Sequence, residues 1–72
     1  MTTLMYPVSS SQITYIGYEE EAKYLFVTFK NGTTYRYEDV PKNIFDALKS
    51  STSVGSYFSI EIKNHYEFTK IN

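Results

Sequence analysis

Residues 24–37 read YLFVTFKNGTTYRY, and this stretch decides the fold of the chain. The side chains from Tyr24 to Lys30 fall alternately on two faces, as in a β-strand, where successive side chains point in opposite directions. The dipeptide Asn31-Gly32 then predicts a hairpin with a type I′ turn, because both residues tolerate positive φ. Residues 33–37 return as the partner strand. The stretch therefore predicts an antiparallel hairpin.

A third strand precedes this hairpin. Residues 13–18 show the same period of two, and the charged run at residues 19–21 marks the turn that follows them. Three strands joined by short turns predict an antiparallel meander.

Both faces of this meander are apolar, so each needs a cover. One face carries Leu25, Val27 and Phe29. The other face is assigned Ile16, Tyr18, Tyr24 and Phe26. The second half of the chain can supply only one layer of helices, and an uncovered aromatic face marks an interaction surface. We therefore expect a homo-oligomer, a dimer or tetramer, built through the second face. Ligand binding there and ordinary exposed tyrosines are the alternatives.

The second half of the chain carries helical signals. Val40-Pro41 breaks the last strand, proline suits the first turn of a helix, and residues 42–49 carry a short apolar stripe. Residues 54–68 fit two patterns. Apolar side chains recur every fourth residue from Val54, as on a helix capped by Ser53, but they also alternate as in a strand. Periodicity alone leaves both interpretations open.

The chain has 72 residues and no cysteine. This length predicts one domain, residues 1–72, with an ordered core from about residue 8 to residue 68. Disulfides are excluded, and no metal site is expected because His65 stands alone. A domain this small is marginally stable by itself, which again favours oligomerisation.

The net charge of −1 argues against generic binding to a phosphate backbone, which needs a basic excess. A small ligand held by a local basic cluster is still compatible with it. Residues 1–8 lack the charged start and apolar run of a signal peptide, and no stretch approaches the roughly 20 apolar residues that span a bilayer. We therefore expect a cytoplasmic protein with no membrane partner.

No catalytic site is expected. A nucleophilic triad would need His65 beside a serine at a strand-to-helix elbow, and no serine has that setting. Carboxylates such as Glu38 and Asp39 lie beside a turn or a helix start, where solvation or the helix dipole explains them. The side chains therefore indicate binding without catalysis and without a cofactor.

The best candidate for a binding segment opens at Ser53. Ser53, Ser56 and the amides around Gly55 begin the candidate helix, and helix N-termini favour anions. Tyr57 offers a ring for stacking on a base, and Lys63 adds a positive charge. The alternative is that Ser53 is only a cap and Gly55 only a packing residue.

Arg36 or Tyr66 is expected to complete this site, from the same or a neighbouring subunit. Tyr35 and Tyr37 share one face of the third strand, where they are expected in the core with their hydroxyls reaching the rim. Arg36 then points to the opposite face, where a guanidinium can stack on a base or hold a phosphate.

The order of these signals resembles the KTSC family. That domain is named for its occurrence at the C-terminus of some lysyl-tRNA synthetases, and it also occurs as small stand-alone bacterial and phage proteins. Tyr35-Arg36-Tyr37 looks like the Tyr-x-Tyr signature of the family. The other matching residues are, in order, Ser9-Ser10, Ile13, Gly17-Tyr18-Glu19, Leu25–Phe29, Gly32, Val40-Pro41, Ser53–Phe58, Ile62 and Tyr66.

The resemblance covers residues 9–66. It implies an α+β fold, in which a three-stranded antiparallel meander is followed by two helices and a short C-terminal extension. It also favours a helix over residues 53–64, because the matching positions there are four apart. A short extended tail is then expected over residues 66–71. Family members usually carry Asn where this chain has Ser59, and a basic cluster where it has Lys63 and His65.

Two functions follow from the resemblance. Some small phage members resemble sponge proteins that oligomerise and trap the cyclic nucleotide signals of bacterial antiphage defence (anti-CBASS sponges). A non-enzymatic sponge for a cyclic dinucleotide is the function we expect. The alternative is an RNA-binding accessory module, which aromatic stacking supports and the net charge opposes. A purely structural interaction protein is a third reading.

Overall fold

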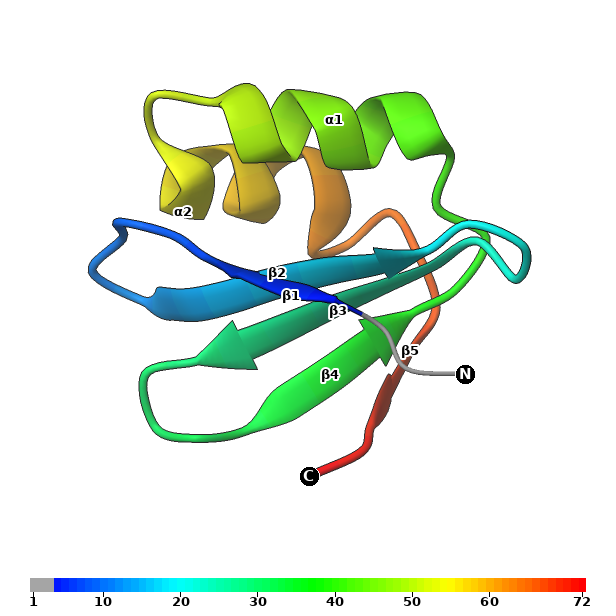
Figure 1. Ribbon diagram of the computed structural model, residues 1–72, viewed down its shortest axis with the longest axis horizontal. Coiled ribbons are helices and arrows are strands. Elements are labelled where there is room, and N and C mark those ends of the chain that lie inside the picture. Colours follow the sequence, from blue (N-terminus) through cyan, green and yellow to red (C-terminus); the bar gives the residue numbers. More distant parts are fainter. Residues whose placement is uncertain (1–3) are drawn as a thin grey trace.

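The computed structural model describes residues 4–72, which form a five-stranded antiparallel sheet with two helical segments on one of its faces (Figure 1). The elements are β1 (Met5–Pro7), β2 (Ile13–Glu19), β3 (Tyr24–Phe29), β4 (Thr34–Tyr37), α1 (Lys42–Ser50), α2 (Val54–Tyr57), the π-helical turn η1 (Phe58–Ile62) and β5 (Phe68–Lys70). Residues 1–3, the start of the stretch predicted to lack an export signal, lie outside the described residues.

The sheet has five strands, in the order β1-β2-β3-β4-β5, so the expected number of three was wrong. The predicted meander is its centre. At one edge Met5 of β1 pairs with Gly17 of β2, and at the other Phe68 of β5 pairs with Tyr37 of β4. Each edge strand has only three residues, and all six are exposed. A period of two cannot be recognised over so short a run, which is why the sequence pattern missed β1. The extended tail expected over residues 66–71 contains β5, but its pairing with the sheet was not expected.

The hairpin between β3 and β4 is confirmed, but its turn is not of type I′. The Gly32 N–H donates to the Phe29 carbonyl at 2.9 Å, and of the turn residues only Gly32 has positive φ, at +90°. The side chain of Asn31 instead accepts a hydrogen bond from the Thr33 N–H at 2.9 Å. This is a type I turn followed by a glycine in a positive-φ conformation, the usual solution when one extra residue must be accommodated.

The register between β2 and β3 corrects the predicted faces of the sheet. A β-bulge lies between Ile13 and Tyr15, after which Ile16 pairs with Val27 and Tyr18 with Leu25. Directly paired residues share a face, so Ile16 and Tyr18 lie under the helices. Ile16 is fully buried. Placing these two residues on the uncovered face was therefore wrong, because the alternation of a strand does not state which partner it faces.

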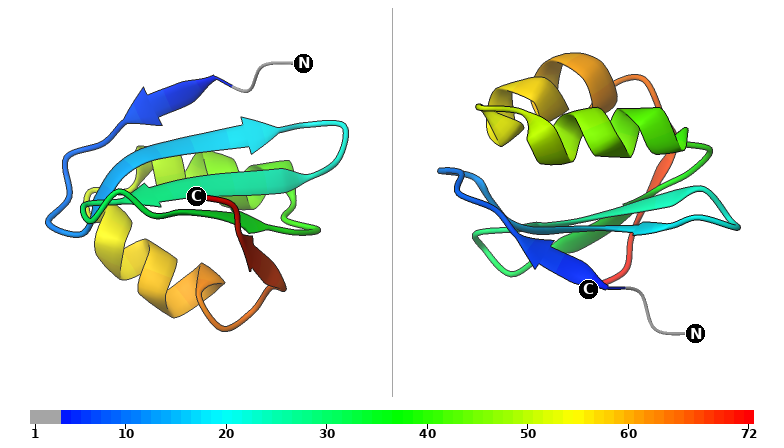
Figure 2. Two further views of the ribbon diagram at one scale, coloured as in Figure 1. Left: turned by 90° about the horizontal axis from the view of Figure 1, so that it is seen from below. Right: turned by 45° about the horizontal axis from the view of Figure 1, so that its top comes forward.

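Helices cover one face of the sheet and make the core with it. The two views in Figure 2 show α1, α2 and η1 on the same side. The buried cluster is composed of apolar and aromatic side chains from both layers: Ile13, Ile16, Leu25, Val27, Tyr37, Val40, Phe45, Leu48, Val54, Phe58 and Ile62.

The four-residue spacing after Ser53 is confirmed as helical, and the strand interpretation of this segment was wrong. The second half of the segment is a π-turn, in which the Lys63 N–H donates to the Phe58 carbonyl at 2.9 Å. Ser53 occupies the N-cap position without a side-chain capping bond. Pro41 precedes α1 as its N-cap residue rather than lying inside its first turn.

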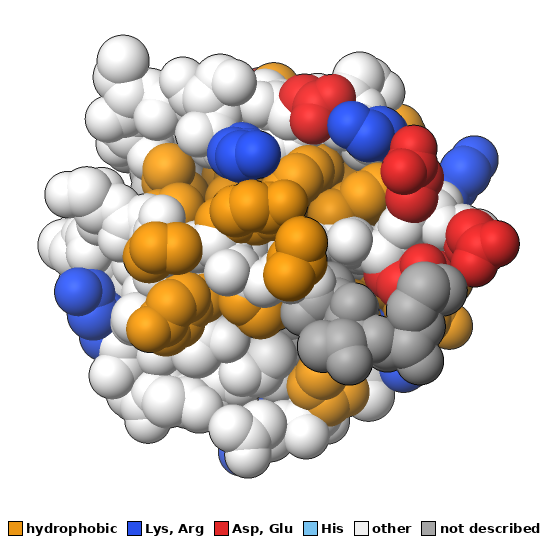
Figure 3. All heavy atoms as spheres, in the orientation of Figure 1, with side chains coloured by type: hydrophobic (Ala, Val, Ile, Leu, Met, Phe, Trp, Pro, Cys, Tyr) orange, Lys and Arg blue, Asp and Glu red, His pale blue; other side chains and the backbone are white. Residues whose placement is uncertain are grey.

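The edge strand β1 is held against α1 by aromatic contacts. The Tyr6 ring lies 6.4 Å from that of Phe45, and the Lys49 ammonium lies 4.2 Å from the centre of the Tyr6 ring. Tyr18 stacks on Phe45 at 5.2 Å. Figure 3 shows hydrophobic side chains gathered along this side of the molecule, between β1 and α1.

The other face of the sheet, here called the open face, has no helix over it in the part of the chain that the structure describes (Figure 2, left). Tyr24 and Phe26 lie half-buried on it, and Arg36 pairs directly with Phe26. The Arg36 guanidinium lies 4.4 Å from the centre of the Tyr24 ring and 3.4 Å from Glu38.

Within the described residues, no helix is both long enough and apolar enough to cross a bilayer. No three or more His, Cys, Asp or Glu side chains come together there as metal ligands.

Candidate functional site

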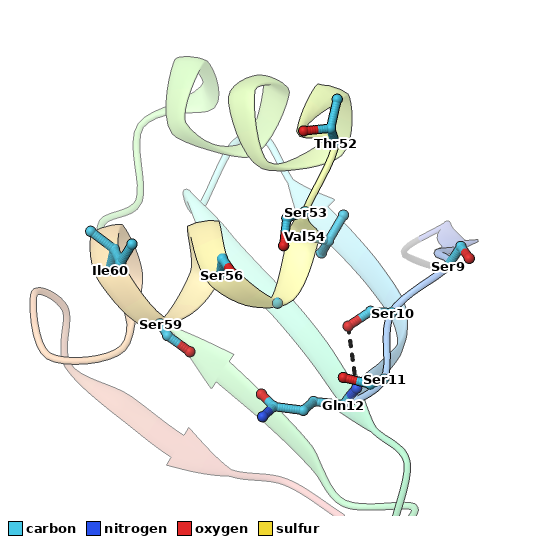
Figure 4. Close-up of a pocket in the computed structure, with 11 residues that line it drawn as sticks. Ser9, Ser10, Ser11, Gln12, Thr52, Ser53, Val54, Ser56, Ser59 and Ile60 are labelled. Carbon is cyan, nitrogen blue, oxygen red and sulfur yellow. Dashed lines mark hydrogen bonds between the residues drawn. The ribbon is translucent and has the colours of Figure 1, made fainter.

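A polar cavity of about 390 Å³ lies between the connection from β1 to β2 and the start of α2 (Figure 4). We call it the serine cleft. It is lined mainly by hydroxyl-bearing side chains, with one amide and two apolar residues: Ser9, Ser10, Ser11, Gln12, Thr52, Ser53, Val54, Gly55, Ser56, Ser59 and Ile60. No charged side chain is among these described residues, so hydrogen bonding is the only polar chemistry that its own wall offers.

Ser10 orders one wall of the serine cleft. Its hydroxyl oxygen accepts hydrogen bonds from the Gln12 N–H at 3.2 Å and the Ile13 N–H at 3.3 Å, the first of which is drawn in Figure 4. A Cβ atom added to Gly55 would lie only 3.1 Å from that same oxygen. The loop can therefore pack this closely on α2 because residue 55 has no side chain.

A second, more apolar cavity of about 600 Å³ opens beside the serine cleft, between η1 and the β4–β5 end of the sheet. We call it the aromatic groove. Five of its lining residues are aromatic, and two are lysines: Ser11, Gln12, Phe29, Lys30, Asn31, Tyr35, Tyr37, Phe58, Ser59, Lys63, Asn64 and Phe68.

The rings of the aromatic groove hold one another in fixed orientations. Phe58 lies edge-on to Phe29 at 5.6 Å and to Tyr37 at 5.4 Å. Phe68 lies edge-on to Tyr35 at 5.6 Å and contacts Tyr37 at the same distance, 5.6 Å. Edge-to-face pairs are favourable, so the cluster forms a firm floor. Phe58 is only 3 % exposed, whereas Phe68 is 57 % exposed and offers its ring to a ligand.

The hydroxyl of Tyr37 is tuned by this burial. Tyr37 is 4 % exposed. Desolvation of the phenolate, and secondly repulsion by Tyr35, raises the pKa of Tyr37 to about 12. The raised pKa extends the range in which this hydroxyl stays protonated to strongly alkaline pH.

The charge around the two cavities differs from that of the whole chain. Lys30 and Lys63 both line the aromatic groove, and neither cavity has an acidic side chain among its described lining residues. The chain as a whole carries a net charge of −1. The described lining of the aromatic groove therefore carries positive charge only, and such a lining favours an anionic ligand.

The fold and these cavities can be set beside known proteins. The sequence pattern of the KTSC domain matches residues 9–66. The chain belongs to the KTSC domain family. A crystal structure of a KTSC domain protein from Yersinia pestis is 34 % identical, with a TM-score of 0.95 over 99 % of this chain and 100 % of that one.

Other relatives of this KTSC domain include two small proteins and one large enzyme. An uncharacterised protein of Stutzerimonas stutzeri is 36 % identical over 66 residues, covering 90 % of this chain and 93 % of its own. A protein of Tsukamurella paurometabola is 36 % identical over 62 residues, covering 86 % and 92 %. A lysine–tRNA ligase of Nostoc punctiforme is 29 % identical over 62 residues, which are 86 % of this chain and 11 % of the ligase.

Three of the six residues predicted to bind a ligand line these cavities of the KTSC domain. Ser53 and Ser56 line the serine cleft, and Lys63 lines the aromatic groove. The structure therefore places the predicted hydroxyls and the predicted charge in two adjoining cavities.

The other three predicted residues lie elsewhere. Tyr57 and Tyr66 pack partly buried against the core, and neither lines the two cavities. A helix turns about 100° per residue, so Tyr57 points roughly 200° away from Gly55. Arg36 lies on the open face, separated from both cavities by the sheet. Within one chain, these three residues do not join the site.

The sequence interpretation missed most of the aromatic groove. Phe29, Tyr35 and Tyr37 share one face of the hairpin, and that alternation was the available signal. The expected core position is confirmed for Tyr37, whereas Phe29 and Tyr35 are partly buried against the core, and the groove opens onto all three. Phe68 gave no usable signal, because its role depends on the edge strand β5 pairing with β4.

Proposed function

We propose that this KTSC domain is a nucleotide-binding protein that catalyses no covalent chemistry. The observation that carries the proposal is the aromatic groove, in which five rings lie beside two lysines with no acidic side chain among the described lining residues. Aromatic rings stack on nucleobases with about 1–3 kcal/mol per base. Lysines hold phosphate as point charges. A base against Phe68 and a phosphate at Lys63 and Lys30 satisfy both requirements.

We propose no catalytic role because the one histidine of the chain, His65, contacts a backbone carbonyl and lies outside both cavities. The His65 ring nitrogen lies 3.1 Å from the Ile60 carbonyl oxygen, and His65 is not among the lining residues of either cavity. General-base work on a ligand needs a base within hydrogen-bond reach of it.

The finer form of the proposal is a sponge, a phage protein that sequesters cyclic dinucleotide signals in the host cytoplasm and so blocks antiphage defence. Sequestration needs a deep site and a stable assembly rather than a catalyst. The volume of the aromatic groove, about 600 Å³, lies within the roughly 300–1,000 Å³ that is usual for small-molecule sites. The small size of the chain supports the need for partner subunits.

The sponge would be a homo-oligomer, a dimer or tetramer, formed through the open face. With Ile16 and Tyr18 removed from that face, Tyr24, Phe26 and Arg36 carry this part of the proposal. The Arg36 side chain is 31 % exposed and its terminal NH2 group lies 3.4 Å from Glu38. The exposed part of the guanidinium is what a partner subunit would contact.

A second candidate function is RNA binding as an accessory module. It is favoured by one observation, the similarity of this chain to a segment of a lysine–tRNA ligase. Single-stranded RNA is also recognised by stacking on aromatic rings. The net charge of −1 counts against a long phosphate-backbone contact.

Calorimetric titration separates these functions. The domain is titrated with purine mononucleotides, cyclic dinucleotides and a short single-stranded RNA. Phe68→Ala should weaken binding about 5- to 150-fold, the equivalent of about 1–3 kcal/mol of stacking. Lys63→Ala should weaken it as well, whereas Lys42→Ala is a matched control, because Lys42 pairs with Asp46 on α1 at 3.3 Å. If neither Phe68→Ala nor Lys63→Ala changes affinity, the ligand does not bind in the aromatic groove.

Sedimentation velocity tests the assembly. We expect a dimer or a larger species at micromolar concentration. Phe26→Glu should dissociate this assembly, because it places a charge on the open face. A stable monomer of 8.4 kDa would contradict the homo-oligomer and leave nucleotide binding untouched.

A further inference from the structure

The serine cleft and the aromatic groove share part of their walls. Ser11, Gln12 and Ser59 line both cavities. Two of these residues come from the connection before β2, and Ser59 comes from η1. The cavities therefore adjoin across a rim of short polar side chains, and one ligand can reach from one to the other.

The two cavities offer different chemistry. The aromatic groove combines rings with Lys30 and Lys63, as a nucleobase and its phosphate require. The serine cleft offers hydroxyls and an amide without a charge among its described lining residues. Such neutral donors and acceptors suit sugar hydroxyls and the polar edge of a second base.

Each of the two cavities is large enough to hold one part of a ligand that has two parts. Small-molecule sites usually enclose about 300–1,000 Å³, and each cavity reaches that range by itself, at about 390 and 600 Å³. A single nucleotide in the groove would leave the serine cleft to water.

Gly55 lies in the wall of the serine cleft, at the point where the loop of Ser10 packs on α2. It lies within α2 and does not have positive φ, so its backbone does not require glycine. Alanine is the better helix former at such a position. A methyl group there would, however, enter the serine cleft 3.1 Å from the Ser10 hydroxyl oxygen, and the loop or the hydroxyl would have to move.

We propose that the aromatic groove and the serine cleft are the two halves of one site for a dinucleotide, with one base in the groove and the second nucleoside in the cleft. This inference rests on the nucleotide binding proposed above. The bridging phosphate would lie near the shared rim, which Ser11 and Ser59 form, with Lys63, the residue after η1, on the groove side.

The experiment compares affinities for one and two nucleotide units. Wild-type protein and variants are titrated with adenosine and guanosine monophosphates and with the linear and cyclic dinucleotides of the same bases. Wild type should bind a dinucleotide about tenfold or more tightly than the monophosphate, because the second unit binds intramolecularly. Gly55→Ala should remove that advantage and leave monophosphate affinity unchanged. Lys63→Ala should weaken both ligands and keep much of the advantage.

Ser56→Leu, at an exposed position that lines only the serine cleft, repeats the test should Gly55→Ala fail to fold. Equal affinity of wild type for the monophosphate and the dinucleotides overturns the two-part site, as does an advantage that survives in the cleft variants. Either result leaves nucleotide binding in the aromatic groove standing. Failure of every nucleotide to bind wild type overturns the proposed function itself.

Discussion

The two faces of the sheet are both rich in large apolar side chains, but they differ in how deeply those side chains are buried. Under the helices, Ile16, Leu25 and Val27 are fully buried. On the open face, Tyr24 and Phe26 lie edge to face at 6.3 Å and remain half-exposed. Both faces carry large apolar side chains, so hydrophobicity alone does not distinguish core from surface in this chain.

The difference between the faces arises from the helices, because α1 and the helical segment after Ser53 both pack on the same face. In the segment after Ser53 the pattern is plain. Its buried side chains, Val54, Phe58 and Ile62, are spaced four residues apart and cover one face only. Phe58, Ser59 and Lys63 of this segment also line the aromatic groove. The covered face thus provides both the core and the candidate site, whereas the open face has no chain of its own to cover it.

The largest expected effect is a difference in folding stability between a substitution on the covered face and one on the open face. Ile16→Ala should destabilise the domain by about 2–5 kcal/mol, because it leaves a cavity in a closed core. Phe26→Ala, on the open face, should cost about 1 kcal/mol, since that ring is only half-buried. Urea unfolding at low protein concentration measures both. Equal costs would contradict the observed register of β2.

The next largest effect is the loss of folding stability at alkaline pH as the Tyr37 hydroxyl ionises. The pKa of Tyr37 is raised to about 12 from its ordinary value of 10.0, by burial first and by Tyr35 second. The folded state therefore holds a proton that the unfolded state has lost between these two pH values. Stability from this group is complete below about pH 10 and should fall by about 2–3 kcal/mol as pH rises to 12.

Unfolding by urea measured from pH 8 to 12 tests this prediction. Tyr37→Phe has no proton to lose and keeps the ring, so its stability should fall less over the same range. Parallel curves for the two proteins would mean that alkaline destabilisation comes from other groups.

The smallest effect belongs to the open face. Arg36 lies over the Tyr24 ring at 4.4 Å. A double-mutant cycle with Arg36→Gln and Tyr24→Leu should give a coupling of about 0.5–1 kcal/mol in the monomer. A coupling that grows with protein concentration would place this pair in a subunit interface. No coupling at any concentration would show that Arg36 is not held by the ring.

Much of the fold was predictable from local patterns. The hairpin at Asn31-Gly32, the helix from Lys42 and the four-residue spacing after Ser53 each depend on near neighbours in sequence. The strand β1 was not predictable, because three exposed residues carry no period, and the expected extended tail at residues 66–71 gave no sign that it pairs with β4. The faces of β2 were assigned wrongly because pairing with β3 and the bulge near Ile13 are non-local facts.

The candidate site divides in the same way. Serines at 53 and 56 and the charge of Lys63 were visible in the sequence, and all three line a cavity. The sequence could not show that Tyr57 turns away from both cavities, which depends on how the helix lies against the sheet. Nor could it show that Phe68 lines the aromatic groove, which depends on the pairing of β5 with β4.

By itself, the sequence determined that this is a small α+β domain without disulfides, built around a hairpin and two helical segments, because turn chemistry and side-chain periodicity act over a few residues. Tertiary structure decided which face of the sheet became the core, and it brought Ser10 beside Gly55 and Phe68 beside Tyr37. These contacts join residues 31 or more positions apart, and only the packing of whole elements brings such residues together.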